Sequence, residues 1–237
     1  MTDRQRKLLL FGGSGQIGQS IAGKFREKGW EVIIVSRSEK SNSAHEIQWD
    51  VDVEKENVVP PALHNFGLFD SVCWAQGVNL NDSIYSFEFG AHKKVYEANV
   101  VFILASLSAL LAANLLSKPA RFCVVSSIWQ NISRQNKLSY AISKSALQGL
   151  VLSLANDMAV DGHLVNAVLP GALDTPMTHS NLSGTQIKSI KESTNFKRLA
   201  KLEDVAGAAY FLCSDENTGV TGQFIKIDLG FSDVRNI

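Results

Sequence analysis

A tyrosine and a lysine, Tyr140 and Lys144, stand four residues apart in the segment SYAISKSAL. In a helix, residues at this spacing share a face, so the ammonium group would lie beside the phenol. A nearby positive charge stabilises phenolate and lowers the pKa of tyrosine from its usual value of about 10. The pair therefore predicts an acid that gives a proton to a carbonyl oxygen near neutral pH. Because this spacing is frequent by chance, the prediction needs support from other motifs.

A glycine-rich turn near the N-terminus has the spacing of a phosphate-binding turn. It directly follows an apolar run and opens an amphipathic stretch. Such a turn lets the backbone approach a pyrophosphate, whose charge is favoured at the N-terminus of the following helix. A plain turn is the alternative, but a strand before it and a helix after it favour dinucleotide binding. The predicted cofactor contacts are Gly12, Ser14, Gly15, Gln16, Ile17 and Gly18.

The next predicted strand ends in Ser36 and Arg37, with no acidic residue before Glu39. NAD-binding sites often place a carboxylate here, which accepts hydrogen bonds from the ribose hydroxyls. A guanidinium instead pairs with a 2′-phosphate through two hydrogen bonds. Ser36 and Arg37 therefore predict a preference for NADP(H), with NAD(H) as the second candidate. The alternative is that Arg37 is only a solvated charge.

Short apolar runs alternate with helical patterns along the chain. Several of the runs are nearly continuous in apolar residues, as in parallel sheets that are covered on both faces. The alternation predicts an α/β fold, namely a Rossmann-type doubly wound parallel sheet in three layers that forms a single domain over residues 1–237. The predicted strands are Leu8–Phe11, Glu31–Ser36, Ser71–Ala75, Phe122–Ser126, Leu164–Leu169 and Gln223–Asp228, and the predicted helices are Gln16–Lys28, His92–Leu116, Tyr140–Ala159 and Glu203–Ser214.

Residues 171–198 show only weak periodicity after a predicted strand end. They are predicted either as a surface insertion or, given the neighbouring motifs, as a substrate lid.

Composition restricts the partners. Lys+Arg and Asp+Glu both number 23, and this zero formal charge argues against nucleic acid or an anionic membrane. No run reaches the roughly 20 apolar residues of a membrane span, and the run LLLF near the start is too short for a signal peptide. We therefore expect a cytoplasmic protein.

The cysteines and two of the histidines lack the spacing of metal ligands. Cys73, Cys123 and Cys213 lie in apolar runs, which predicts buried, reduced thiols and no metal site. His163 and His179 show no paired spacing and are predicted at the surface.

At this point the sequence resembles the short, single-domain branch of the short-chain dehydrogenase/reductase family over nearly its whole length. Ser127 stands 13 residues before Tyr140, as the family's catalytic serine does. Asn99 resembles the catalytic asparagine of the family's long central helix. Other matching positions are Asp50 and Val51 at the adenine, Ala75, Gln76 and Gly77 within the stretch that replaces the family's Asn-Asn-Ala-Gly, and Pro170, Gly171 and Thr175 at the nicotinamide.

The resemblance implies hydride transfer between a nicotinamide and a carbonyl carbon. Tyr140 would act as general acid or base, and Lys144 would lower its pKa and bind the nicotinamide ribose. Ser127 would donate a hydrogen bond to the carbonyl oxygen. Asn99 would hold a water between Lys144 and solvent, unless it only bridges backbone groups. Thr175 would contact the nicotinamide, unless it only starts a turn.

Three departures from the family pattern lie on the cofactor side. Phe11 replaces the usual threonine before the glycines, which removes a hydroxyl that would tie the turn to a neighbouring strand. Gln16 occupies a place where the short members have glycine. The asparagines of the family's Asn-Asn-Ala-Gly motif are absent, with Trp74 and Gln76 in that stretch, and Gln76 could supply one polar contact.

The leading hypothesis is an NADP(H)-dependent ketoreductase or alcohol dehydrogenase for a small carbonyl or alcohol, similar to 3-oxoacyl-carrier-protein reductases. An NAD-linked sugar or cyclitol dehydrogenase and a non-catalytic dinucleotide sensor are the alternatives. The family implies a homotetramer or homodimer, for which the apolar stretches 100–116 and 140–159 offer helix faces. An acyl carrier protein would favour basic residues of the lid, although solvation explains them equally well.

Overall fold

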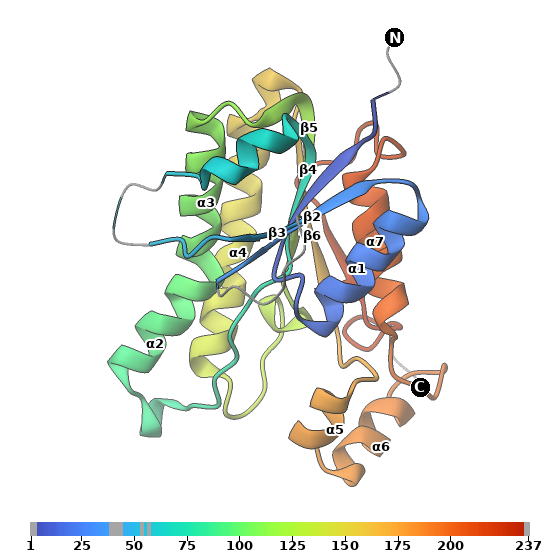
Figure 1. Ribbon diagram of the computed structural model, residues 1–237. Coiled ribbons are helices and arrows are strands. Elements are labelled where there is room, and N and C mark those ends of the chain that lie inside the picture. Colours follow the sequence, from blue (N-terminus) through green and yellow to red (C-terminus); the bar gives the residue numbers. More distant parts are fainter. Residues whose placement is uncertain (1–3, 38–44, 53–54, 56–57, 235–237) are drawn as a thin grey trace.

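Seven parallel strands form one sheet in the order β3-β2-β1-β4-β5-β6-β7, and they carry the predicted Rossmann-type fold (Figure 1). The structure is a computed structural model and describes residues 4–37, 45–52, 55 and 58–234. The strands are β1 (Lys7–Phe11), β2 (Glu31–Ser36), β3 (Glu46–Gln48), β4 (Phe69–Trp74), β5 (Leu116–Val125), β6 (Leu164–Pro170) and β7 (Phe224–Ile227).

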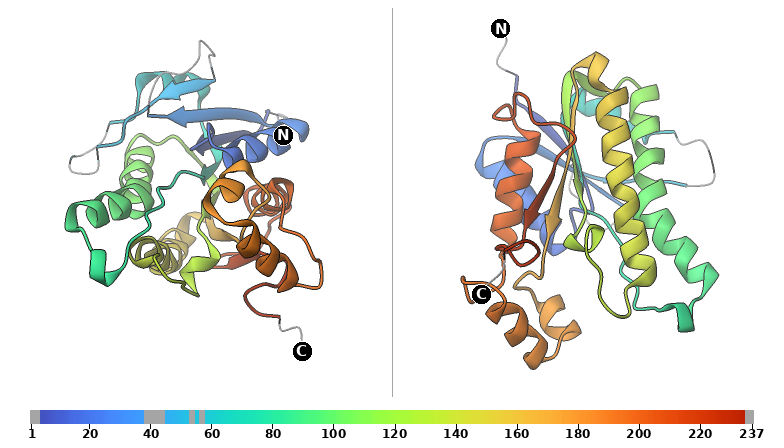
Figure 2. Two further views of the ribbon diagram at one scale, coloured as in Figure 1. Left: turned by 90° about the horizontal axis from the view of Figure 1, so that it is seen from below. Right: turned by 180° about the vertical axis from the view of Figure 1, so that it is seen from behind.

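Helices cover both faces of the sheet, which gives the predicted three layers (Figure 2). One face carries α1 (Gln16–Glu27) and α7 (Leu202–Cys213), and the other carries α2 (Phe89–Tyr96), α3 (Phe102–Ala112) and α4 (Leu138–Asp157). Two short helices, α5 (Pro176–Asn181) and α6 (Gly184–Glu192), follow β6 and lie beyond the carboxyl ends of the strands. In open parallel sheets this edge is where ligands bind.

The predicted bounds of the long central helix were wrong, and the strand after it begins at Leu116 rather than at the predicted Phe122. The helix expected over His92–Leu116 begins at Phe89, passes through a π-helical turn (Glu97–Val101) and ends at Ala112. Asn114 has a left-handed φ of 54°, which ends the helix, and the apolar residues after it begin β5. The edge strand β3 was missed because three residues carry too little periodicity. The Gly29 cap is confirmed by its φ of 79°.

By length and composition alone, the stretch Phe89–Ala112 could cross a membrane. The expectation that no segment is long and apolar enough for a membrane span was therefore wrong. In the structure it covers one face of the sheet, and Ile103, Leu107 and Leu110 lie in the core. Packing against the sheet therefore accounts for the buried part of its apolar character, whereas Leu104 and Leu111 are exposed.

The thiols were predicted correctly, but one histidine was not. Cys73, Cys123 and Cys213 are free and fully buried. His163 is 2 % exposed rather than on the surface, because its Nδ1 accepts a hydrogen bond of 2.8 Å from the Ala120 amide at the adjoining strand. His179 is exposed, as predicted.

The glycine turn depends on close backbone contact, which gives a testable difference between two glycines of α1. A Cβ on Gly18 would lie 2.3 Å from the Gly12 carbonyl oxygen, whereas a Cβ on Gly23 would meet nothing within 4 Å. We expect Gly18→Ala to lower the free energy of unfolding by about 1–3 kcal/mol through overpacking. The matched control Gly23→Ala should raise it by up to about 1 kcal/mol through helix propensity. Urea unfolding measures both, and a loss of equal size in the two variants would contradict this account of the turn.

Candidate active site

The predicted pair Tyr140 and Lys144 lies on the first turns of α4, where the helix passes the carboxyl end of β5. The Lys144 ammonium is buried and donates a hydrogen bond of 3.0 Å to the Val125 carbonyl at the end of that strand. Its Nζ lies 5.7 Å from the centroid of the Tyr140 ring. The shared helix face that the spacing predicted is therefore present.

Ser127 reaches the same place from the other side, because it follows β5 directly. Its hydroxyl forms a hydrogen bond with the Tyr140 hydroxyl, and its Oγ also accepts the Trp129 amide at 3.3 Å. The latter bond caps the short 3-10 turn Ile128–Gln130. The structure thus brings together the three residues that the sequence singled out for proton transfer and carbonyl binding.

Burial, rather than the neighbouring lysine, governs the ionisation of this pair. Burial raises the pKa of Tyr140, and the hydrogen bond with Ser127 opposes that rise. Burial also lowers the pKa of Lys144 to about 8, since the ammonium is out of contact with water. The net shift of the Tyr140 pKa is therefore upward, contrary to the expected lowering.

Asn99 sits in the π-helical turn and is 1 % exposed. Its Oδ1 accepts the Val78 amide at 2.7 Å, and its Nδ2 donates to the Val78 carbonyl at 3.0 Å and to Ser143 Oγ at 2.9 Å. It therefore bridges backbone groups. Gly77 lies close to the side chains of Asn99 and Lys144, because a Cβ there would be 3.2 Å from Asn99 Oδ1 and 3.6 Å from Lys144 Nζ. The water-holding role of Asn99 stays a prediction.

Sequence reasoning missed the residues that fix the start of α4. Asp82 accepts hydrogen bonds from the amide of Ser139, at 3.0 Å, and from its hydroxyl. Lys137 is 4 % exposed and donates to the side-chain oxygens of Asn79 and Asn81 at 2.5 and 2.6 Å. These contacts join the segment after β4 to the helix that carries Tyr140. No signal in the sequence connects partners that lie 56 to 58 residues apart.

The glycine turn fits a dinucleotide cofactor. A Cβ on Gly12 would lie 2.5 Å from the Gln76 amide nitrogen, so the turn lies directly against the end of β4. The N-terminus of α1 at Gly15 has no side-chain cap and no acidic residue in its first turn, which favours an anion there. The amide nitrogen and oxygen of Gln76 are shielded from water without a hydrogen-bond partner, as expected of a group that awaits a polar ligand.

Two of the departures from the family pattern prove to be one feature. Phe11 and Trp74 are directly paired in the register of β1 and β4, and their rings stack at 5.9 Å and 4°. Trp74 also donates its indole N–H to Ser106 Oγ at 2.9 Å. An aromatic stack therefore joins the two strands at this point. The glycine turn that follows still lies against the end of β4.

The predicted adenosine contacts lie at the end of β2 and just after β3. Ser36 ends β2, and Arg37 is exposed with its carbonyl accepting a hydrogen bond of 3.2 Å from Gln48. Asp50 is exposed and Val51 is buried. Ser38 and Glu39, on which part of the cofactor prediction rested, lie outside the described residues.

Pro170 ends β6, and Gly171 packs so tightly that a Cβ would lie 2.7 Å from Asp228 Cβ. Thr175 caps α5 by accepting the Thr178 amide at 3.2 Å, which is the turn-starting role. Its contact with a nicotinamide stays a prediction.

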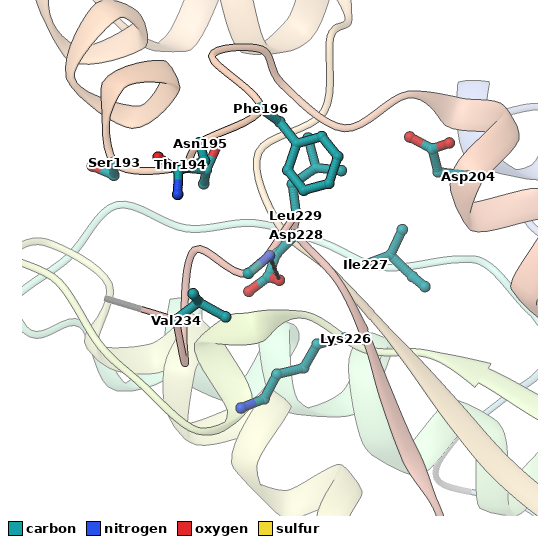
Figure 3. A pocket seen from close by; sticks show the side chains of 11 residues that line it. Ser193, Thr194, Asn195, Phe196, Asp204, Lys226, Ile227, Asp228, Leu229 and Val234 are labelled. Carbon is teal, nitrogen blue, oxygen red and sulfur yellow. Dashed lines mark hydrogen bonds between the residues drawn. The ribbon is translucent and has the colours of Figure 1, made fainter. Parts of the chain in front are cut away.

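The segment 171–198 contributes to a cavity of about 610 Å³, whose other wall is the end of β7 and the turn after it (Figure 3). Phe196 of the segment and Val234 beyond β7 are among its lining residues. Tyr140 and Lys144 do not line it; Asp228, which does, contacts Gly171. Within the described residues, no group of three or more His, Cys, Asp or Glu side chains is placed to hold a metal ion.

Comparison with known proteins agrees with this arrangement. Residues 13–232 match the family model described as Enoyl-(Acyl carrier protein) reductase. The chain belongs to the short-chain dehydrogenase/reductase family. It is therefore an NAD(P)-dependent dehydrogenase/reductase acting on alcohol or carbonyl groups.

Its relatives differ in substrate. The chain is 28 % identical to the 3-oxoacyl-(acyl-carrier-protein) reductase of Salmonella typhimurium, with 94 % of this chain and 95 % of the relative covered. It is 27 % identical to the L-rhamnose 1-dehydrogenase (NADP(+)) of Thermoplasma acidophilum, with 95 % of each covered. A putative short-chain alcohol dehydrogenase from Sinorhizobium meliloti has a similar structure, with a TM-score of 0.86, 26 % identity and 97 % of each chain covered.

The buried ammonium of Lys144 gives a prediction for stability. The pKa of Lys144 is about 8 in the folded chain against 10.5 for an exposed lysine, so between these values the unfolded chain binds more protons and stability increases with pH. The cost of burial is fully present below about pH 8. We expect Lys144→Met to raise the free energy of unfolding at pH 7 by about 1–3 kcal/mol, after the loss of one hydrogen bond.

Urea unfolding at pH 7 and pH 10 measures this effect, and the gain should shrink at the higher pH. Lys118→Met is the matched control, because Lys118 is exposed and pairs with Asp161 at the surface. A stability loss in Lys144→Met at pH 7 would show that the ammonium stabilises the fold instead.

Proposed function

We propose that this protein is an NADP(H)-dependent reductase or dehydrogenase of a small carbonyl or alcohol, with Ser127, Tyr140 and Lys144 as its catalytic residues. The observation that carries this proposal is the hydrogen bond between the hydroxyls of Ser127 and Tyr140 beside the buried ammonium of Lys144. Two hydroxyls converge there on one point, where a carbonyl oxygen can accept hydrogen bonds from both.

Each residue then has a chemical task. Ser127 donates a hydrogen bond to the carbonyl oxygen and holds it against Tyr140, which gives its proton to that oxygen as the alcohol forms. In the opposite direction Tyr140 takes the proton back. Lys144 holds positive charge beside the phenolate that remains. NADPH, when bound, supplies the hydride for the carbonyl carbon.

The glycine turn, Gln76, Asp50 and Val51 would hold the adenosine and pyrophosphate, and Pro170, Gly171 and Thr175 would hold the nicotinamide. The preference for NADP(H) rests on Arg37, whose guanidinium forms no ion pair in the part of the chain that the structure describes. The rhamnose dehydrogenase relative is named as an NADP(+) enzyme, which supports the same preference.

A sugar dehydrogenase is the second candidate, because sugar dehydrogenases stand beside the oxoacyl reductases among the relatives. Turnover of aldoses with NADP⁺, set against turnover of 3-oxoacyl esters with NADPH, separates the two. Tight cofactor binding without turnover of either class would favour a dinucleotide sensor. Segment 171–198 is proposed as the substrate lid, since its helices α5 and α6 follow β6 at the carboxyl ends of the strands, where Tyr140 also lies. A cytoplasmic location and a homodimer or homotetramer stay predictions.

The role of Tyr140 is tested by Tyr140→Phe, which removes only the hydroxyl. We expect turnover to fall by about 100- to 10,000-fold, the usual contribution of a general acid. Affinity for NADPH, measured by calorimetry, should change little. Tyr85→Phe is the control, because Tyr85 is 98 % exposed. Near-normal turnover in Tyr140→Phe would remove Tyr140 from the mechanism.

The role of Arg37 is tested by Arg37→Ala. Loss of a charged pair with the 2′-phosphate should weaken NADPH binding by about tenfold to a hundredfold, while NADH binding stays unchanged. Calorimetry with both cofactors measures this difference. Arg26→Ala, at the far end of α1, is the control. Equal weakening for NADH and NADPH would contradict recognition of the 2′-phosphate.

A further inference from the structure

A second lysine faces the ring of Tyr140. Lys137 immediately precedes α4, and its Nζ lies 5.5 Å from the centroid of that ring, against 5.7 Å for Lys144. Lys144 reaches the ring through the helical spacing of α4, whereas Lys137 reaches it from the N-cap position, outside the helix. Two ammonium groups therefore flank the same phenol, although only one of them belongs to the motif read from the sequence.

The Lys137 ammonium is oriented but not neutralised. It is buried, and it donates to the neutral side-chain oxygens of Asn79 and Asn81 at 2.5 and 2.6 Å. The neighbouring carboxylate, Asp82, is engaged by the amide and hydroxyl of Ser139. In the described part of the chain Lys137 forms no salt bridge. A buried charge without a counterion destabilises a protein, so its retention next to a reacting group indicates a functional use.

The other charged groups near this point are few. Burial, followed by the charge of Arg134, lowers the pKa of Lys137, and the Asp82 carboxylate opposes this shift. Lys144 faces Tyr140 from one turn further along α4, and His92 of α2 contacts Ser139 at 2.9 Å. Apart from Asp82, the charges here are positive or neutral, so the local field favours an anion.

We propose that Lys137 is a positioning residue of this active site, whose charge, held in place by Asn79 and Asn81, stabilises the phenolate form of Tyr140 together with Lys144. This inference rests on the proposed role of Tyr140. The phenolate is the form that remains after Tyr140 protonates a carbonyl oxygen, and it is the form that accepts a proton from an alcohol. Burial alone disfavours it.

The test is a titration of Tyr140 followed by phenolate absorbance in the near ultraviolet, isolated by subtracting the signal of the same protein carrying Tyr140→Phe. Lys137→Met removes the charge and the hydrogen bonds. Lys137→Gln keeps a donor for the asparagines without the charge. Lys137→Arg keeps both and stays charged throughout the titration. Because Lys137 itself loses its proton in the range where Tyr140 titrates, the wild type should lie between the variants. We expect the apparent pKa of Tyr140 to be about one pH unit lower in the Arg variant than in the Met and Gln variants.

The control variant Lys118→Met, which removes an exposed lysine from the start of β5, should leave the titration unchanged. If Lys137→Arg and Lys137→Gln titrate alike, Lys137 only joins the segment after β4 to α4, and the proposal is overturned. Because the titration needs no substrate, its outcome is separate from the turnover test of Tyr140→Phe. If the Met variant does not fold, the comparison of Gln with Arg still decides.

Discussion

The burial of one ammonium group, that of Lys144, constrains most of this site. A charge out of water requires fixed acceptors and space. Val125 supplies the acceptor because β5 ends there, and Gly77 leaves the space because it has no side chain. The ends of β4 and β5 must therefore meet the first turns of α4 at one edge of the sheet. Ser127 and Asn99 occupy their places because they follow or pack against these same elements.

Local patterns in the sequence were sufficient for the centre of the site. The spacing of Tyr140 and Lys144 on a helix, and the place of Ser127 just after an apolar strand, fix three side chains through elements whose periodicity is strong. The glycine turn could be predicted equally well, because a strand precedes it and a helix follows it. Lys137 and Asp82 were not, because their partners come from a loop that tertiary packing brings to α4.

Burial was the property that the sequence could not supply. The charge of Lys144 predicts a lowered pKa for Tyr140, yet burial of the phenol raises that pKa. The burial of His163 could not be predicted either, because no residue near it in the sequence indicates that its ring accepts a hydrogen bond from the Ala120 amide. The end of α3 at Ala112 was hidden for a related reason: apolar residues continue from the helix into β5, and only the left-handed turn at Asn114 separates the two.

The stack of Phe11 on Trp74 restricts how this sequence can diverge. Both side chains are 1 % exposed, so a polar residue at one position alone would face an aromatic ring without a hydrogen-bond partner. Two polar residues could form a hydrogen bond with each other, and two aromatic rings stack. A polar residue beside an aromatic ring does neither. A change from an aromatic pair to a polar pair, made one substitution at a time, therefore passes through a destabilised sequence. A substitution at one of the two positions is therefore expected to require a matching substitution at the other.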